Sequence, residues 1–274
     1  ATLNAAECFG LKDRGALAPG YRADIVLLDD LKDFHVDKVW INGEFVAEDG
    51  KYLPEIQVHD ISSVKGSVIV KDFSKEKFKM NLKSNKVNVI QILPGGVVTG
   101  KATAEIILDE NGEFVRNPEE DIVKVAVVER HQGTGNVACG FLKGYGIKSG
   151  AVALSIAHDS HNIIVVGVSD EEMEFAVQSL IAQEGGIVLV KEGKVIESMP
   201  MPIGGLMSDQ SGEWVDQKLT DIHEKAYEEL GICGDVEPVM TLCFMSLAVI
   251  PEVKLTDMGL FDVTTFSFIP VEAE

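Results

Sequence analysis

Two short apolar runs enclose a polar stretch near the middle of the chain, and this pattern constrains the fold strongly. The runs cover residues 151–154 and 163–168, and each has the length of a buried strand. Between them, residues 155–162 read Ser-Ile-Ala-His-Asp-Ser-His-Asn. We therefore predict two strands joined by a loop that presents polar side chains beside a sheet, namely His158, Asp159, His161 and Asn162.

The HxxH spacing of His158 and His161 does not by itself identify a site. Two imidazoles on a loop can converge on a metal ion, on a substrate or on each other. The alternative is a polar turn in which the same side chains hydrogen-bond within the loop. Both interpretations remain open from the spacing alone.

Composition and charge disfavour several classes of protein. Hydrophobic residues make up 46% and charged residues 25% of the 274 residues, which is typical of a globular protein. The formal net charge of −20 repels nucleic acid and anionic lipid, so neither is expected as a partner. No uninterrupted apolar stretch reaches about 18 residues, so we predict no membrane span. The four cysteines form no CxxC pair, and we expect reduced thiols in a cytoplasmic protein.

Turn signals and apolar periodicity divide the chain into three parts. Residues 1–50 contain a short helix, a buried strand and a hairpin whose turn is Asn42-Gly43. Residues 51–64 are polar and are predicted to be a linker. Residues 65–274 alternate strands and hairpins with two amphipathic helices. The fold class predicted for this last part is α+β with a mixed or antiparallel sheet.

Several assignments within residues 65–274 are specific enough to be tested. Ser169 is predicted to be the N-cap of one helix, and residues 215–230 are predicted to form another. Residues 137–145 are also predicted to be helical, and residues 239–250 to be a buried strand or a core helix. The remaining predictions are a strand at 66–70, a loop at 251–261 and a final strand at 264–270.

Five short motifs follow one another in residues 1–50. They are Asn4-Ala5-Ala6, Asp13-Arg14-Gly15, Leu17-Ala18-Pro19-Gly20, Ala23-Asp24-Ile25-Val26 and Val39-Trp40-Ile41-Asn42-Gly43. Together they resemble the end of a cyclic amidohydrolase. In that superfamily this segment follows the last strand of a metal-dependent (β/α)8 barrel and returns to a small β-sandwich. The resemblance implies that residues 1–50 are the end of the barrel and part of that sandwich.

Motifs after residue 120 narrow the resemblance. They are Glu129-Arg130-His131, Gly133-Thr134-Gly135, Gly140-Phe141, residues 155–162, Pro200-Met201-Pro202 and Gly204-Gly205-Leu206-Met207-Ser208. Their order is similar to that in bacterial adenine deaminases. Members of that family convert adenine and water to hypoxanthine and ammonia with a divalent metal, usually iron or manganese. The resemblance thus implies adenine as substrate and a homo-oligomeric hydrolase of purine metabolism.

The metal ligands of that family lie on the barrel, before the position that corresponds to Ala1. They comprise an HxH pair, a bridging carboxylate, two further histidines and an aspartate, and none is matched here. We therefore expect no metal ligands in this chain, with manganese or iron held by a missing N-terminal barrel segment. The chain is interpreted as the C-terminal part of an adenine deaminase that covers the active site and is inactive alone. The alternative is a non-catalytic purine-binding or regulatory module derived from the family.

The resemblance also implies roles for individual residues. His158, Asp159 and His161 would assist catalysis, whereas the substrate contacts would come from Asn162, Arg130, His131, Gly204, Gly205 and Ser208. Three alternatives stay open. They are a hydrogen-bonded turn at 158–162, a solvent-facing ion pair between Arg130 and Glu129, and an ordinary crossover loop at 204–208. His223 has no ligand-type partner nearby in sequence and is assigned no role.

Overall fold

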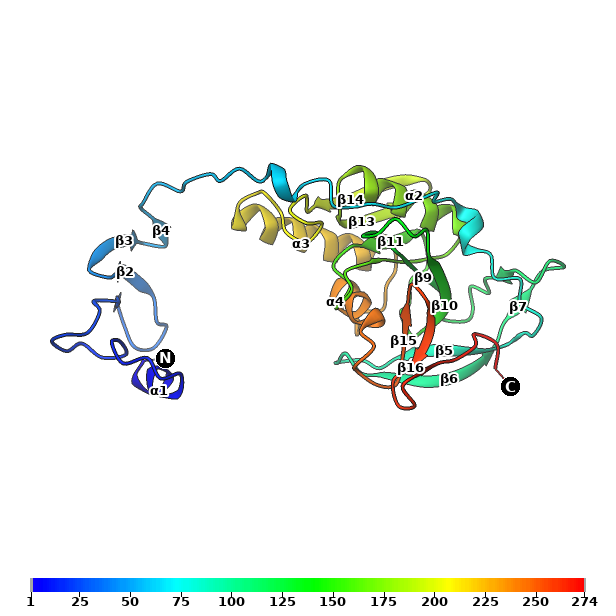
Figure 1. Cartoon of the computed structure of the whole chain (residues 1–274), viewed down its shortest axis with the longest axis horizontal. Coiled ribbons are helices and arrows are strands. Elements are labelled where there is room, and N and C mark those ends of the chain that lie inside the picture. Colours follow the sequence, from blue (N-terminus) through cyan, green and yellow to red (C-terminus); the bar gives the residue numbers. More distant parts are fainter. Residues whose placement is uncertain (1, 274) are drawn as a thin grey trace. The chain divides into compact units, whose positions relative to one another are not determined.

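The chain divides into two compact units, one ending at Asp60 and the other beginning at Ile61, in a computed structural model that describes residues 2–273 (Figure 1). The first unit contains one helix and one antiparallel sheet of four strands in the order β1-β2-β3-β4. Its elements are α1 (Leu3–Cys8), β1 (Ile25–Leu28), β2 (Val36–Ile41), β3 (Glu44–Glu48) and β4 (Lys51–Tyr52).

The hairpin predicted at Asn42-Gly43 is confirmed. Both residues have positive φ, 53° and 82°, as the two central positions of a type I′ turn require. They connect β2 to β3, and Val39 pairs with Ala47 across the hairpin. Both faces of the sheet leave apolar side chains open, because the consecutive β1 residues Val26 and Leu27, which point to opposite faces, are 56% and 46% exposed.

The second unit is built on an eight-stranded sheet with the order β14-β13-β11-β12-β9-β10-β5-β6 (Figure 1). Neighbouring strands are antiparallel except β10 and β5, which are parallel, so the sheet is mixed and the predicted α+β class is confirmed. The strands are β5 (Lys86–Ile92), β6 (Thr99–Glu105), β9 (Ile122–Val128), β10 (Val137–Lys143), β11 (Ala151–Leu154), β12 (Ile163–Gly167), β13 (Gly186–Lys191) and β14 (Lys194–Pro200).

Both faces of this sheet are covered. Every residue of β9 is buried, and its alternate side chains enter two different hydrophobic clusters. Ala126 and Val128 pack with the buried face of α2 (Asp170–Ala182), whereas Val125 and Val127 pack on the opposite side. Coverage on both faces explains why the strand sequences read as continuous apolar runs with little alternation.

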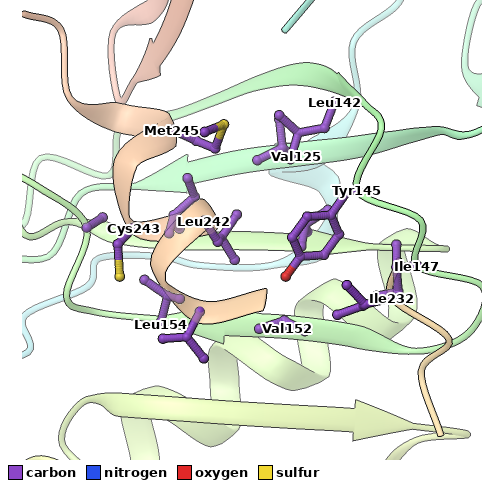
Figure 2. Close-up of a cluster of buried hydrophobic side chains, with 14 of the residues drawn as sticks. Val125, Leu142, Tyr145, Ile147, Val152, Leu154, Ile232, Leu242, Cys243 and Met245 are labelled. Atoms are coloured by element: carbon purple, nitrogen blue, oxygen red, sulfur yellow. The ribbon is translucent and has the colours of Figure 1, made fainter. Parts of the chain in front are cut away.

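The side of the sheet that faces away from α2 carries two helices and a small sheet. They are α3 (Gly212–Glu228), α4 (Pro238–Cys243), β15 (Val253–Thr256), β16 (Gly259–Asp262) and β17 (Ser267–Phe268). Figure 2 shows Leu242 of α4 among the strand residues Val125 and Leu154. Tyr145 belongs to the same cluster, and its hydroxyl donates a hydrogen bond to the Pro238 carbonyl at 2.7 Å.

The N-cap predicted at Ser169 is confirmed, because its Oγ accepts a hydrogen bond from the backbone N–H of Glu172 at 3.2 Å. The helix predicted at 215–230 is α3, which begins at Gly212. Residues 239–250 start as a core helix, so the strand alternative is wrong there. Short elements complete the unit: η1 (Ser62–Val64), η2 (Lys75–Phe78), β7 (Ile107–Leu108), β8 (Phe114–Val115) and η3 (Phe244–Ser246).

Three assignments were wrong. Residues 137–145 contain strand β10 and not a helix, because β10 (Val137–Lys143) pairs along its whole length with β9. Residues 251–261 were predicted to be a loop but contain β15 and the start of β16. Residues 66–70 form no strand, although the Ile69 N–H donates to the carbonyl of Arg130 at 2.8 Å. The final strand is also shorter than predicted, covering only Ser267–Phe268.

None of the helices within residues 2–273 combines the length and the hydropathy of a membrane span.

Candidate functional site

Arg130 joins three segments that are far apart in the sequence. It is the second residue after β9, and it is only 1% exposed. Its Nε donates to the His161 carbonyl at 2.5 Å and its Nη2 donates to the Gly204 carbonyl at 3.3 Å. Its backbone N–H donates to Asn162 Oδ1 at 3.3 Å. The end of β9, the 155–162 loop and the Gly204-Gly205 turn therefore meet around one guanidinium group.

The guanidinium has no carboxylate partner within residues 2–273, and its Nη1 is a buried donor with no hydrogen-bond partner there. Burial lowers the pKa of Arg130, although the nearby charge of Glu129 raises it. The alternative of a solvent-facing ion pair between Arg130 and Glu129 is wrong, because Arg130 is buried and bonds to backbone carbonyls.

The Glu129 carboxylate is instead enclosed by the turn that follows it. It accepts hydrogen bonds from the backbone N–H groups of His131, Gln132 and Thr134 at 2.5, 2.7 and 2.9 Å. Burial alone would raise the pKa of Glu129, but these hydrogen bonds stabilise the anion and lower the pKa to about 2. A permanent negative charge thus fixes the turn that carries His131.

The 155–162 loop is anchored at its start by Ser155, which is fully buried. The Ser155 hydroxyl donates to the Gly205 carbonyl at 2.6 Å and accepts the N–H of Gly186 at 2.7 Å. At the end of the loop, Asn162 Nδ2 donates to Asp257 Oδ1 at 3.3 Å. Both ends of the loop are therefore tied to neighbouring elements, which restricts the backbone between them.

The two imidazoles of the loop lie near each other. The ring centroids of His158 and His161 are 5.7 Å apart, and the His158 ring lies 4.8 Å from that of Phe244. The His158 backbone N–H also donates to the Cys243 carbonyl at 2.9 Å. Burial lowers the pKa of His161, and the charges of His158 and Arg130 lower it further. A lowered pKa favours the neutral ring at pH 7, which can accept or donate a hydrogen bond.

Gly205 allows this close assembly. Its φ is +72°, in the left-handed region that favours glycine. A Cβ at this position would lie 2.7 Å from Arg130 Nη1, closer than nonbonded heavy atoms approach. Both glycine carbonyls of the turn also accept internal hydrogen bonds, from Arg130 and Ser155. The Gly204-Gly205 turn is thus held in place by the site.

The predicted site residues occupy three different environments. The cluster around the guanidinium contains Arg130, His158, His161, Asn162, Gly204 and Gly205. Asp159 and His131 lie at its exposed margin, where His131 Nε2 is 2.7 Å from the Ser160 carbonyl oxygen. Ser208 has a different environment, because its hydroxyl accepts the N–H of Gln210 at 3.2 Å.

Sequence reasoning assigned no role to three residues that organise the site, namely Ser155, Glu129 and Asp257. Ser155 opens the polar stretch, and its position at a strand end was an available signal. Asp257 gave no signal, because it follows Asn162 by 95 positions and approaches it only in the folded chain.

The HxxH pair does not extend to a metal centre in the part of the chain that the structure describes. Among residues 2–273, no group of three or more His, Cys, Asp or Glu side chains is arranged to hold a metal ion. The residues present therefore do not match the ligand set of a hydrolytic metal centre, and we assign no catalytic step to a metal bound by them.

Known proteins resemble this chain along its whole length. An adenine deaminase 2 from Desulfotalea psychrophila is 67% identical over 273 residues, covering 100% of this chain and 47% of that protein. An adenine deaminase from Ligilactobacillus salivarius is 48% identical over 274 residues, again covering 100% of this chain and 47% of the relative. The chain thus spans about half the length of these curated relatives.

Two family matches divide the chain. Residues 1–46 match the amidohydrolase family, and residues 96–267 match the adenine deaminase C-terminal domain. The second match includes the end of β9, the 155–162 loop and the Gly204-Gly205 turn. The chain belongs to the adenine deaminase C-terminal domain family.

Proposed function

We propose that this chain is the C-terminal part of an adenine deaminase, which converts adenine and water to hypoxanthine and ammonia. Relatives named adenine deaminase, about twice as long as this chain, support the proposal. The match of residues 1–46 to the amidohydrolase family supports a preceding barrel that supplies a divalent metal, manganese or iron. Residues 61–274 would then contribute to the purine site without binding the metal.

The observation that carries this role is the hydrogen bond from the buried Arg130 guanidinium to the backbone of the 155–162 loop. This loop carries His158 and His161 and is called the histidine loop below. A side chain held by buried partners can be placed more accurately than one on a free loop. We assign His158 and His161 to contact with the substrate, where a neutral imidazole can assist proton transfer. Arg130, Asn162, Gly204 and Gly205 hold this loop in place. Asp159 and His131 would contribute at its margin, and Ser208 from the segment that follows the Gly204-Gly205 turn.

Replacement of either imidazole in the complete enzyme tests the proposal. His158→Ala and His161→Ala should lower turnover by about 10²-fold or more, the range of general acid–base contributions, with unchanged metal content. His35→Ala is the matched control, because His35 is an exposed residue of the first unit that pairs with Asp29. Steady-state ammonia release and metal analysis of the same preparations provide the two readouts.

A loss of metal with little loss of turnover per bound metal would contradict the proposal and return the HxxH pair to a metal-binding role. If His158→Ala and His161→Ala turn over adenine as fast as the control His35→Ala, the loop has no role in catalysis.

We further propose that the β1–β4 sheet packs on other strands of the complete enzyme. The exposure of Val26 and Leu27, one on each face of the sheet, supports this, since exposed large apolar side chains often mark surfaces that a partner covers. A cytoplasmic location agrees with the four cysteines, which are all unpaired.

A further inference from the structure

A cavity of about 440 Å³ lies beside the histidine loop, within the unit that begins at Ile61. Residues from the loop, from β13 and β14, from α3 and from α4 line it. Its walls are mainly aliphatic and thioether side chains, including Ile187, Met199, Leu206, Leu219, Val239 and Met240. Small-molecule sites commonly have this size and an apolar lining with few polar groups.

Besides Cys243, three histidines and one glutamate line the cavity, and one of these four side chains has a ring nitrogen without a hydrogen-bond partner. His161 Nδ1 is buried and has no hydrogen-bond partner within residues 2–273. A buried ring nitrogen without a partner costs free energy, which a ligand that supplies the missing hydrogen bond would recover. His158 lies beside it, so two imidazole rings of the histidine loop line the cavity.

The other two polar groups form a pair. His223 of α3 hydrogen-bonds to one oxygen of Glu237, and the second oxygen accepts the backbone N–H of Met240 at the start of α4. The carboxylate is therefore held as part of the cavity lining by two donors. It can accept a further hydrogen bond from a ligand N–H, whereas it would repel an anionic ligand.

These features select a class of ligand. Thioether and aliphatic walls suit a flat aromatic face, and methionine sulfur makes favourable contacts with aromatic rings. An N–H group at the edge of such a ligand can donate a hydrogen bond to the Glu237 carboxylate. A ring nitrogen of the ligand can form a hydrogen bond with the His161 imidazole. The Glu237 carboxylate and the net charge of −20 both disfavour a phosphate group. The combination fits an uncharged, planar nitrogen heterocycle and not a nucleotide.

We infer that this cavity binds a purine base, adenine or hypoxanthine, within the unit that begins at Ile61. The choice of a purine among planar heterocycles rests on the proposed function. The preference for a free base over a nucleotide rests on Glu237 and the charge of the chain. The cavity thus assigns ligand contacts to His223 and Glu237 in addition to the two loop histidines.

Binding to the chain itself tests the inference. Titration calorimetry of the full chain with adenine, hypoxanthine and AMP should give saturable 1:1 binding of both bases and binding of AMP at least tenfold weaker. His161→Asn should weaken base binding at least tenfold. Asparagine tolerates the left-handed backbone of residue 161, where φ is 53°, so the loop should keep its shape. His35→Asn, outside the cavity, is the matched control and should bind as the parent does.

A second variant tests whether the bases bind inside the cavity. Leu219→Trp adds bulk from α3 into the cavity and should abolish binding of both bases, with helix content checked by circular dichroism. Failure of both bases to bind the parent chain overturns the inference. AMP binding as tight as adenine binding, or full affinity in both His161→Asn and Leu219→Trp, also overturns it.

The inference and the proposed function can fail separately. If His161→Ala slows the complete enzyme but the isolated chain binds no base, the catalytic role of the loop stands and the cavity assignment is refuted. If the chain binds bases through the cavity but the histidine variants leave turnover unchanged, the cavity is a binding site and the proposed catalytic role is refuted.

Discussion

Two adjacent glycines provide a direct test of how tightly the candidate site is assembled. Gly204 and Gly205 both have positive φ, 66° and 72°, but only Gly205 packs on a side chain. An added Cβ at Gly204 would meet no atom within 4 Å. At Gly205 it would lie 2.7, 3.0 and 3.1 Å from Nη1, Cζ and Nη2 of Arg130. The pair therefore separates backbone strain from steric overlap with the guanidinium.

The expected losses of stability differ for this reason. Alanine in the left-handed region costs about 1–2 kcal/mol, and the lower entropy of the unfolded chain offsets about 0.4–1 kcal/mol. Gly204→Ala should thus lower the free energy of unfolding by about 1 kcal/mol. Gly205→Ala should lower it by about 2–4 kcal/mol, because overpacking adds about 1–3 kcal/mol. Arg130 cannot move away easily, since its guanidinium is buried and bonded to two carbonyl groups.

Thermal unfolding followed by Trp214 fluorescence measures the difference. Trp40→Phe in the background removes the other tryptophan of the chain, so the signal reports the unit that contains α3. For a unit of this size, each kcal/mol corresponds to a change in Tm of about 2–4 °C. Arg130→Met should reduce the difference between the two glycine variants. Equal losses at Gly204 and Gly205 in the parent background would refute the packing described for this site.

Three further substitutions have expected outcomes. Ser155→Ala should lower the free energy of unfolding by about 1–3 kcal/mol in urea titration, because it leaves two buried backbone groups without their partner; an unchanged midpoint would contradict this. Glu129 has a pKa of about 2, below its ordinary value of 4.5, so it stabilises the fold above pH 4.5 and that stability is lost as the pH falls toward 2. Glu129→Gln should therefore flatten the dependence of the urea midpoint on pH in this window, and a curve parallel to that of the parent would count against the enclosed carboxylate. Burial lowers the pKa of Lys254 to about 8 from 10.5, so stability should rise between pH 8 and 10.5 as the unfolded state alone retains the proton. Lys254→Met should remove this rise, and its persistence in the variant would show that another group causes it.

Local sequence patterns predicted the elements that depend on local contacts. The strands on either side of residues 155–162, the Ser169 cap and the Asn42-Gly43 turn each follow from neighbouring residues. Strand β10 was mistaken for a helix because its conformation is set by pairing with the preceding strand β9 on one side and with β5, from a distant part of the chain, on the other. In such a segment, tertiary pairing overrides local propensity.

The hairpin of β15 and β16 was missed for a different reason. Three consecutive residues of β15, Val253, Lys254 and Leu255, are buried, and the middle one carries a charged group. The Lys254 ammonium donates to the Val97 carbonyl at 3.0 Å, which makes its burial possible. A lysine ordinarily indicates a surface position, so the strand pattern was hidden in the sequence.

The same reasoning explains which parts of the candidate site could be predicted. The histidine loop and the Gly204-Gly205 turn were identified because their residue types are unusual in regular elements. The cavity was not, since His223 and Glu237 lie on separate elements and reach the loop histidines only through the packing of α3 and α4. A site built from several elements gives no contiguous signal in one sequence.

The buried guanidinium of Arg130 lowers the stability of the fold but fixes the backbone of the candidate site. A buried guanidinium without a carboxylate partner is less favourable than an apolar side chain of similar size, because its desolvation is only partly offset by hydrogen bonds to carbonyl groups. Those bonds nevertheless link the backbone of His161 to the Gly204-Gly205 turn, which a methionine could not do. The location of this cost beside the two loop histidines, and not in the sheet core, is what a binding site requires, because there the positions of a few atoms matter more than the total stability.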